Sequence, residues 1–208
     1  MIKNILFDIG NVFITVQPER ALAKLSKFMD PHTAALLCEK EDEFMKKIQH
    51  DQELLETGMM TMDQFFAKLK NEIGLKMDLE QFEDVWCSMF SRKKDVIQFA
   101  GELSEKYKIF LLSNTNETHI NHLFKALPIF DFISGHALSH EIGYLKPQPD
   151  FYYEALKKLN INAKESVFID DLELNVNAAA KAGITAFKFE NLEKLKNDLA
   201  SVIMPKVL

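Results

Sequence analysis

The sequence predicts an α/β protein built on a Rossmann-like, doubly wound parallel sheet, with an all-helical segment inserted into it. Three observations lead to this prediction. Short apolar runs recur along the chain, helical patterns separate the later runs, and a long interval after the first run has no good strand pattern. Strands that alternate with helices are typical of βαβ units, in which helices cover both faces of a parallel sheet.

Five short runs rich in β-branched, aromatic or other apolar residues are expected to be the strands. Each run is too short for a core helix and is bounded by polar residues or glycine. The runs cover residues 4–7, 108–112, 131–134, 166–169 and 184–189.

Helical patterns fill the intervals between the later strands. They cover residues 117–127, 150–159 and 175–182, and the third ends at Gly183, where glycine is a common stop. This alternation of helix and strand is the basis for predicting parallel pairing.

Residues 17–90 are expected to form a helical cap domain of about four helices. The interval has no good strand, and residues that favour the first turn or the cap of a helix recur along it. These start signals are Pro18, the pair Asp30 and Pro31, the capping box of Thr61 and Gln64, and Asp78 before a pattern over 79–90.

The sheet domain is therefore expected to be split, with residues 1–16 joined to residues 91–208. No repeat, low-complexity tract or flexible linker interrupts this arrangement. The helical insertion should then pack against the edge of the sheet that holds the strand ends.

The composition favours a small molecule as the partner. The 208 residues are 47% hydrophobic and 27% charged, and the formal net charge is −6. An acidic chain without a basic stripe is not expected to bind nucleic acid or an anionic membrane surface. An anionic small molecule would need local positive charge at its site.

The protein is expected to be cytoplasmic, and either a monomer or a homodimer. Its N-terminus has no basic segment followed by a long apolar stretch, and no run approaches the ~18 apolar residues of a membrane-spanning helix. The two cysteines, Cys38 and Cys87, have neither redox nor metal-ligand spacing, so they are expected to be reduced core thiols.

Polar residues follow the predicted strands at the points where ligands bind in open parallel sheets. Asp8 follows the first strand, and residues 113–115, with the sequence SNT, follow the second. The loop after the third strand contains Lys146, and residues 170–171 are an aspartate pair after the fourth. Three carboxylates, a hydroxyl and an ammonium are therefore expected to meet in one crevice.

This constellation predicts a magnesium site beside a phosphoryl site. Crowded carboxylates repel one another unless a hard cation binds, and ligation by oxygen alone suits Mg²⁺. Ser113 and Lys146, with backbone N–H groups where the SNT loop enters its helix, could then hold phosphoryl oxygens. Asp8 remains as a nucleophile that attacks phosphorus.

The same segments resemble the haloacid dehalogenase superfamily, whose members are mostly phosphatases. FDIGNV resembles its first motif, LLSNT the second, GYLKPQPDFY the third and VFIDDLELNV the fourth, in the correct order. The site of the insertion resembles that of the helical cap of the first (C1) cap class. The likeness is closest to a subgroup whose first motif reads DLGNV or DLGGV and which includes phosphatases of α-D-glucose 1-phosphate.

The resemblance implies a role for each motif residue and a small phosphate ester, such as a sugar phosphate, as the substrate. The nucleophile would form an aspartyl-phosphate and also ligate Mg²⁺, and a pair of acidic residues would complete the metal site directly or through water. The implied residues are Asp8 as nucleophile and ligand; Ser113, Asn114 and Lys146 at the phosphate; Asp171 as the main metal ligand; Asp170 acting through water or as support; and Asn175 as support.

Gly10 departs from the family pattern, which usually has a second aspartate there as general acid and base. The backbone carbonyl of Gly10 can still serve as a metal ligand, but the usual proton carrier is absent. General acid catalysis typically contributes ~10²–10⁴-fold in rate. The enzyme could prefer good leaving groups, or another residue or the substrate's hydroxyls could carry the proton.

Two other functions stay open on the sequence alone. The chain could be a catalytically weak phosphate-binding or regulatory protein that retains the phosphate pocket. It could also be a 2-haloacid dehalogenase, because halide leaves without a proton and dehalogenases of this superfamily also lack the second aspartate. The aspartate pair at 170–171 and the KPQPDFY loop favour the phosphatase.

Several aromatic, methionine and histidine residues of the helical patterns are expected to be structural rather than functional. Methionine and aromatic residues at helical spacing are more often core than pocket, although they could line a substrate site. The histidines at helical spacing lack a third metal ligand and are expected to form a polar face. These residues are Met59, Met60, Met62, Phe65, Phe66 and Trp86, and the histidines His119 and His122.

Overall fold

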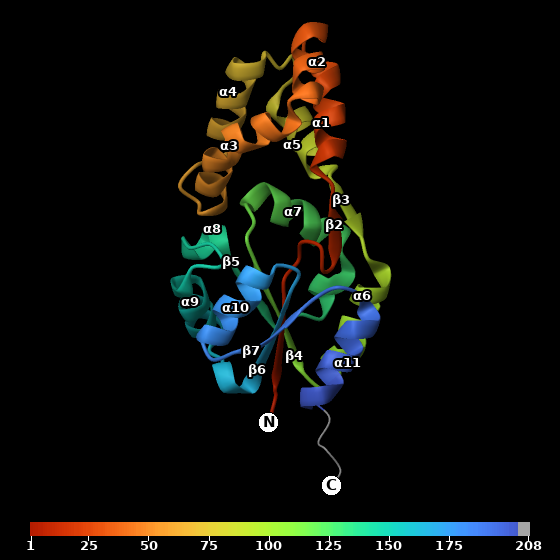
Figure 1. Cartoon of the computed structure of the whole chain (residues 1–208), viewed down its shortest axis with the longest axis vertical. Coiled ribbons are helices and arrows are strands. Elements are labelled where there is room, and N and C mark those ends of the chain that lie inside the picture. The colour runs from red at the N-terminus through yellow and green to blue at the C-terminus, as the bar shows by residue number, and fades with distance from the viewer. Residues whose placement is uncertain (204–208) are drawn as a thin grey trace.

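A five-stranded parallel sheet forms the lower half of the molecule (Figure 1). The structure is a computed structural model that describes residues 1–203, apart from the side chains of residues 38 and 41, so the prediction for Cys38 lies outside the described residues. The strand order is β5-β4-β1-β6-β7, and every neighbouring pair is parallel. The bounds are β1 (Asn4–Phe7), β4 (Lys108–Ser113), β5 (Gly135–Leu138), β6 (Ser166–Asp170) and β7 (Thr185–Lys188).

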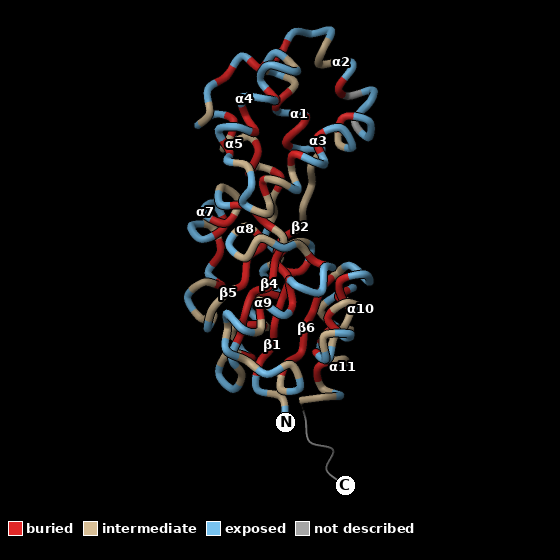
Figure 2. Tube along the Cα trace, turned by 90° about the vertical axis from the view of Figure 1, so that its left-hand side faces the viewer, coloured by how far each residue is buried: buried red, intermediate tan, exposed pale blue. Residues whose placement is uncertain are grey.

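Helices cover both faces of this sheet, as the predicted doubly wound class requires. Alternate residues of β1 point to opposite faces, so Ile5 and Phe7 belong to one buried cluster and Leu6 to another. The first cluster is completed by α6 (Lys94–Ser104), α7 (Glu117–Ala126) and α11 (Leu192–Ile203), and the second by α9 (Pro149–Leu159) and α10 (Glu173–Lys181). Figure 2 shows the buried trace along β1, β4 and β6.

Five α-helices lie between β1 and the later strands and pack around a hydrophobic core of their own (Figure 1). The predicted start signals are confirmed, because Asp30 caps a helix and both Thr61 and Asp78 form capping boxes. About four helices were expected, but Lys40 has a non-helical backbone that separates two of them. The helices are α1 (Pro18–Leu25), α2 (Pro31–Glu39), α3 (Glu41–Glu56), α4 (Met62–Ile73) and α5 (Leu79–Cys87), with a 3₁₀ turn at Ser26–Phe28.

A two-stranded antiparallel ribbon joins this helical region to the sheet. Strand β2 (Ile14–Val16) pairs with β3 (Phe90–Arg92), so the chain leaves and re-enters the sheet region side by side. The ribbon corrects the prediction of a helix over 79–90, since α5 ends at Cys87 and Phe90 begins a strand. Its pairing joins segments far apart in sequence, which a local helical pattern does not reveal.

The third predicted strand is wrong in position. Residues 131–134 were expected to be extended, but a 3₁₀ turn covers Pro128–Asp131 and the strand β5 begins at Gly135. Phe132 and Ile133 lie between this turn and β5 and pack against the core from there. A short helix, α8 (Ser139–Ile142), follows β5. None of the described helices is both long and apolar enough to cross a membrane.

Candidate active site

Three aspartates gather at the carboxyl ends of β1 and β6. Phe7 and Ile169 are partners in the parallel pairing of these strands, so the residues that follow them, Asp8 and Asp170, come out at the same edge. Asp8 and Asp170 are buried, and Asp171 is partly exposed. Each of the three offers an oxygen, and these oxygens lie within 4.8 Å of one another. The predicted carboxylate cluster is therefore present in the fold.

Lys146 lies between two of these carboxylates. Its Nζ is 2.7 Å from Asp8 Oδ1 and 2.7 Å from Asp170 Oδ2, and it also donates to the carbonyl of Leu112 at 3.0 Å. Burial acts to lower the pKa of Lys146, but the two carboxylates outweigh burial and raise that pKa above its ordinary value. The lysine is thus a fixed positive charge inside an acidic protein.

Asn114 holds the loop that carries this lysine. The Lys146 N–H donates to Asn114 Oδ1 at 2.8 Å, and Asn114 Nδ2 donates to the Lys146 carbonyl at 3.0 Å. Because both ends of the amide are used in this way, the Asn114 side chain positions Lys146. A contact from Asn114 to phosphate would come from its main chain. Ser113, the last residue of β4, is buried beside it.

Asp8 and Asp170 differ in how their charge is supported. Burial raises the pKa of Asp8 to about 6; the charge of Lys146 opposes this shift, and the charge of Asp170 adds to it. Asp170 accepts from Asn175 Nδ2 at 2.9 and 3.1 Å and from the Leu172 N–H at 2.8 Å. Asn175, which was expected to support the site, therefore contacts the carboxylate of Asp170.

Asn11 is a residue that the sequence reasoning did not include in the site. Its Nδ2 donates to Asp171 Oδ2 at 3.1 Å, and its Oδ1 accepts from the Val16 N–H at 3.2 Å. Asn11 has φ of 52°, a left-handed conformation that asparagine tolerates better than most residues. An asparagine just after a strand end was the available signal.

Gly10 has no conformational need to be glycine. It is absent from the residues with positive φ, and a Cβ added there would meet Asp8 Oδ2 at 3.6 Å and Val16 Cγ2 at 3.8 Å, which are ordinary contacts. Its carbonyl accepts from the Val12 N–H at 2.7 Å and keeps a second lone pair for a metal ion. The missing side chain is therefore a chemical difference that the backbone does not impose.

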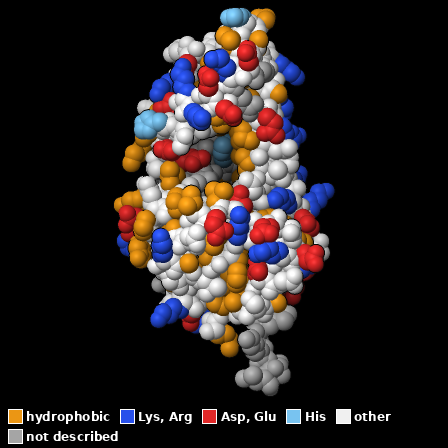
Figure 3. All heavy atoms as spheres, viewed as in Figure 1, with side chains coloured by type: hydrophobic (Ala, Val, Ile, Leu, Met, Phe, Trp, Pro, Cys, Tyr) orange, Lys and Arg blue, Asp and Glu red, His pale blue; other side chains and the backbone are white. Residues whose placement is uncertain are grey.

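A cavity of about 230 Å³ lies between the helical region and the strand ends. Gly10, Ser113 and Asn114 line its lower side, and residues of α1, α3 and α5 line its upper side. Figure 3 shows the surface hollowed between these two parts of the molecule, with acidic and histidine side chains at the hollow. Gly10, Ser113 and Asn114 therefore face a partly open space of small-molecule size, whereas Asp8, Lys146, Asp170 and Asp171 are not among the residues that line it.

Glu56, Trp86 and His119 also line this cavity, and the sequence reasoning missed them as site residues. Burial raises the pKa of Glu56 to about 7, and the negative charges of Asp8 and Glu53 add to the shift. Burial lowers the pKa of His119 to about 3, with a contribution from His122, so His119 is uncharged at neutral pH. Trp86 is also part of the helical core, as expected.

The methionine and phenylalanine group on α4 and the preceding loop does not line the cavity. Met62, Phe65 and Phe66 are buried in the helical core, and Met59 is exposed. The interpretation as core residues is confirmed for Met62, Phe65 and Phe66 and is wrong for Met59, which lies on the surface.

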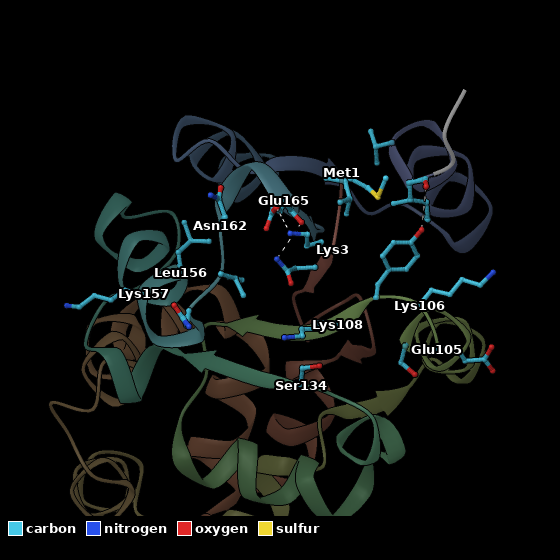
Figure 4. Close-up of a pocket in the computed structure, with 18 residues that line it drawn as sticks. Met1, Lys3, Glu105, Lys106, Lys108, Ser134, Leu156, Lys157, Asn162 and Glu165 are labelled. Carbon is cyan, nitrogen blue, oxygen red and sulfur yellow. Dashed lines mark hydrogen bonds and ion pairs between the residues drawn. The ribbon is translucent and has the colours of Figure 1, made fainter. Parts of the chain in front are cut away.

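A larger hollow of about 1410 Å³ lies at the opposite end of the sheet (Figure 4). Its lining includes Met1, Lys3, Lys108 and Glu165, and Lys3 pairs there with Glu165 at 2.6 Å. None of the predicted site residues lines it. The predicted catalytic and metal-binding side chains therefore lie at the carboxyl ends of the strands and not at this larger hollow.

Fold and strand-end groups together define the class: a hydrolase of the α/β structural class, with a Rossmann-like parallel sheet and an acidic cluster suited to phosphoryl transfer. A family model described as haloacid dehalogenase-like hydrolase matches residues 2–183. The chain belongs to this family.

Similar proteins include phosphatases and hydrolases of the same family. The D-ribitol-5-phosphate phosphatase of Bacteroides thetaiotaomicron is 26% identical over 98% of this chain and 99% of its own. A family enzyme of that organism, solved with magnesium and inorganic phosphate, is 27% identical with a TM-score of 0.80, covering 94% of this chain and 99% of its own. A predicted family hydrolase of Porphyromonas gingivalis, 24% identical over 99% of this chain and 100% of its own, also has a TM-score of 0.80 and supports the fold.

The protein is therefore a phosphatase of this family, a phosphoric monoester hydrolase. The cluster of Asp8, Asp170 and Asp171 fits a magnesium ion, because three carboxylates meet there and, among the described residues, Lys146 alone forms ion pairs with them.

Proposed function

We propose that the protein hydrolyses the monophosphate ester of a small, uncharged sugar or sugar alcohol, with Mg²⁺ as its cofactor. The single observation that supports this most strongly is the bridge from Lys146 to both Asp8 and Asp170 at 2.7 Å, beside a cavity of about 230 Å³. The buried ammonium can bind the negatively charged phosphate, and the acidic cluster beside it can bind the positively charged metal ion.

Asp8 is the proposed nucleophile. Its pKa of about 6 leaves it ionised at neutral pH, so an Oδ atom can attack phosphorus while the ester oxygen leaves. Water then attacks phosphorus of the aspartyl-phosphate, which releases inorganic phosphate and restores the carboxylate. Lys146, the hydroxyl of Ser113 and the Asn114 N–H are proposed to hold the phosphoryl oxygens throughout.

The proposed metal ligands are Asp8, the Gly10 carbonyl and Asp171, with Asp170 acting through water or as support. Bound Mg²⁺ supplies positive charge that lets a carboxylate approach a phosphate ester. Asn11 and Asn175 orient two of these carboxylates by the hydrogen bonds described above.

Glu56 is our proposed source of the proton that position 10 cannot supply. It is the acidic side chain that lines the cavity together with Gly10 and Ser113, and the charge of Asp8 acts on it. A carboxyl group with a pKa of about 7 is protonated in part at neutral pH, as a general acid must be. Its donation to the leaving oxygen would replace the aspartate typical of the family.

Small phosphate esters of the sugar type fit the size of the cavity. D-ribitol 5-phosphate is the substrate of a relative similar over the whole chain, and glucose 1-phosphate is the substrate implied by the first motif. The cavity volume of about 230 Å³ lies below the range of about 300–1,000 Å³ that is usual for drug-sized ligands.

We also propose that residues 17–90 act as a cap domain over a core domain of residues 1–16 and 91–208. A cytoplasmic location and a monomeric or homodimeric state stay predictions.

A catalytically weak phosphate-binding protein is the second candidate, and Gly10 is the observation that favours it. A 2-haloacid dehalogenase is disfavoured, because such an enzyme has no use for the magnesium site that the cluster of Asp8, Asp170 and Asp171 provides.

Phosphate release and halide release separate these functions. We expect phosphate from ribitol 5-phosphate, glucose 1-phosphate or p-nitrophenyl phosphate with Mg²⁺, and none in EDTA or with Asp8→Asn. Activity that persists in EDTA or in the variant would overturn the mechanism. Chloride release from 2-chloropropionate in EDTA would indicate a dehalogenase. Mg²⁺-dependent binding of a phosphate ester without turnover would indicate a binding protein.

A further inference from the structure

We propose that the N–H groups of Trp86 and His119 form a recognition pair for a neutral oxygen of the substrate, away from its phosphate. The inference deepens the proposed function, because it assigns the uncharged, hydroxyl-bearing part of the substrate to two named donors. No motif of the family includes either residue in this sequence.

The first observation is that both nitrogens lack partners. Within residues 1–203, Trp86 Nε1 and His119 Nε2 are the buried side-chain nitrogen or oxygen atoms that make no hydrogen bond. Both residues line the same cavity, and Trp86 is only 3% exposed. Leaving a buried donor unpaired costs about 1–3 kcal/mol. Two such donors at one small cavity indicate a ligand that accepts from them.

Hydrogen bonds around His119 identify its Nε2 as a donor. Asn116 Oδ1 accepts from the His119 main-chain N–H at 2.9 Å, so the other end of that amide is the NH₂ group. That group lies 3.1 Å from His119 Nδ1, which must therefore accept. The ring is uncharged at neutral pH, so its one proton is on Nε2.

The two donors come from different parts of the fold. Trp86 lies on α5 in the helical region, and His119 lies on α7 beside the sheet. Their rings are nearly parallel at 18°, with centroids 6.4 Å apart, and Phe90 contacts the His119 ring edge-on at 4.8 Å. Aromatic packing therefore fixes both rings, so that little side-chain entropy is lost when a ligand binds.

The charge of the lining identifies the chemical class of the acceptor. Among the described lining residues there is no lysine or arginine, His119 is neutral, and Glu56 is the acidic one. A second phosphate or a carboxylate would be buried here without a positive partner, which is costly. A hydroxyl or ring oxygen suits two neutral N–H donors, and Gln52 and Glu56 can accept the hydroxyl protons in return.

The test compares a hydroxylated substrate with an analogue that lacks hydroxyls. Ribitol 5-phosphate is compared with n-pentyl phosphate, and glucose 1-phosphate with cyclohexyl phosphate. We expect Trp86→Phe and His119→Asn each to lower kcat/KM about tenfold for the hydroxylated member, and to change it less than about twofold for the other. His119→Gln, whose amide can place an N–H near the Nε2 position, should recover part of the loss.

An equal loss for both members of a pair would overturn the inference, because it would show a structural role only. An unchanged kcat/KM for the hydroxylated member in both variants would also overturn it. Selective hydrolysis of a substrate with a second phosphate or a carboxylate would contradict the assigned class.

Binding to Asp8→Asn separates failure of this inference from failure of the proposed function. Trp86 is the single tryptophan of the chain, so its emission reports on this site directly. We expect ribitol 5-phosphate or glucose 1-phosphate to shift the emission, and inorganic phosphate to leave it unchanged. A shift without turnover by the wild-type protein would support the recognition pair and reject the phosphatase mechanism. Turnover of these compounds without any shift would support the phosphatase mechanism and reject the recognition pair.

Discussion

The strand-end site and the cavity wall differ in how completely their polar atoms are paired. In the strand-end site (Asp8, Asn11, Lys146, Asp170, Asp171 and Asn175), side chains bind one another through the short contacts of Lys146, Asn11 and Asn175. On the cavity wall (Glu56, Trp86 and His119), two buried N–H donors have no partner among residues 1–203. The side chains of the first region are held in place by contacts within the protein, whereas the two donors of the second can gain partners only from a ligand. We therefore expect changes to the first to affect all substrates and changes to the second to affect some.

The largest effect is expected from Lys146→Met. Removing the ammonium leaves two buried carboxylates facing each other, so the free energy of unfolding should fall by about 3 kcal/mol without Mg²⁺, and turnover should be lost. Urea denaturation with and without Mg²⁺ is the measurement, and Mg²⁺ should restore part of the stability.

The control is Lys157→Met, which removes an exposed lysine whose side chain is 77% accessible and whose partner, Glu154, is on the surface. It should change neither stability nor turnover measurably. If Lys146→Met were as stable as the control without Mg²⁺, the strand-end site would not depend on its buried ion pairs.

Gly10→Asp should have the next largest effect, and in the opposite direction. The backbone and the surrounding space accept a side chain there, so the variant should fold and gain a proton carrier beside the reacting groups. We expect hydrolysis of n-pentyl phosphate to rise tenfold or more, and that of p-nitrophenyl phosphate, which has a good leaving group, to change little. Gly10→Asn has the same size without an acidic proton. Equal gains in both variants would show that acidity is not the cause.

Glu56→Gln tests the acidic group of the cavity wall through two measurements, the free energy of unfolding and the turnover rate. The folded state holds the Glu56 proton up to a pKa of about 7, whereas the ordinary value is 4.5. Folding therefore takes up a proton between these pH values, and the wild-type protein loses stability as pH rises through them. The variant should remain neutral and exceed the wild type by about 2 kcal/mol at pH 8.5 but not at pH 4.

The kinetic measurement compares the turnover of substrates with poor and good leaving groups. Glu56→Gln should reduce turnover of n-pentyl phosphate about tenfold and that of p-nitrophenyl phosphate much less, because only the poor leaving group needs the proton. Glu43→Gln, an exposed change on the same helix, is the matched control. A uniform loss on both substrates would remove Glu56 from the proposed mechanism.

The smallest effect is expected from Met59→Ala. Met59 is 72% exposed and does not line the cavity, so neither unfolding free energy nor kcat/KM for any substrate should change beyond error. A selective loss with the hydroxylated substrates would extend the cavity wall to the loop before α4.

The strand-end site was largely predictable because its positions follow from local patterns. Asp8 and the aspartates at 170–171 each adjoin a short apolar run, and parallel pairing brings such positions to one edge, while Lys146 lies in the loop that follows another strand. Asn11 was missed because its two hydrogen bonds reach Val16 and Asp171, which no local pattern links.

The cavity wall was not predictable for a different reason. Trp86 and His119 have the spacing of ordinary amphipathic helices, and only the placement of α5 over α7 brings their rings together. The same limit explains the fold errors, because β3 is a strand only through its pairing with β2. Before β5, apolar residues 132–133 pack against the core from the segment that joins a 3₁₀ turn to the strand, rather than from a strand.

The β2–β3 ribbon makes the whole helical region equivalent, in topology, to the loop of a β-hairpin. The ends of that loop are closed by pairing of Val16 with Phe90 and by the bond from the Gln17 N–H to the Met89 carbonyl at 2.9 Å. The entropy of closing a flexible loop grows slowly, by about 0.6 kcal/mol for each doubling of length. Helices could therefore be lengthened, shortened or exchanged above the ribbon at small cost while the carboxylates below keep their geometry. The substrate range of such a protein can therefore change through its helical region while the catalytic carboxylates stay the same.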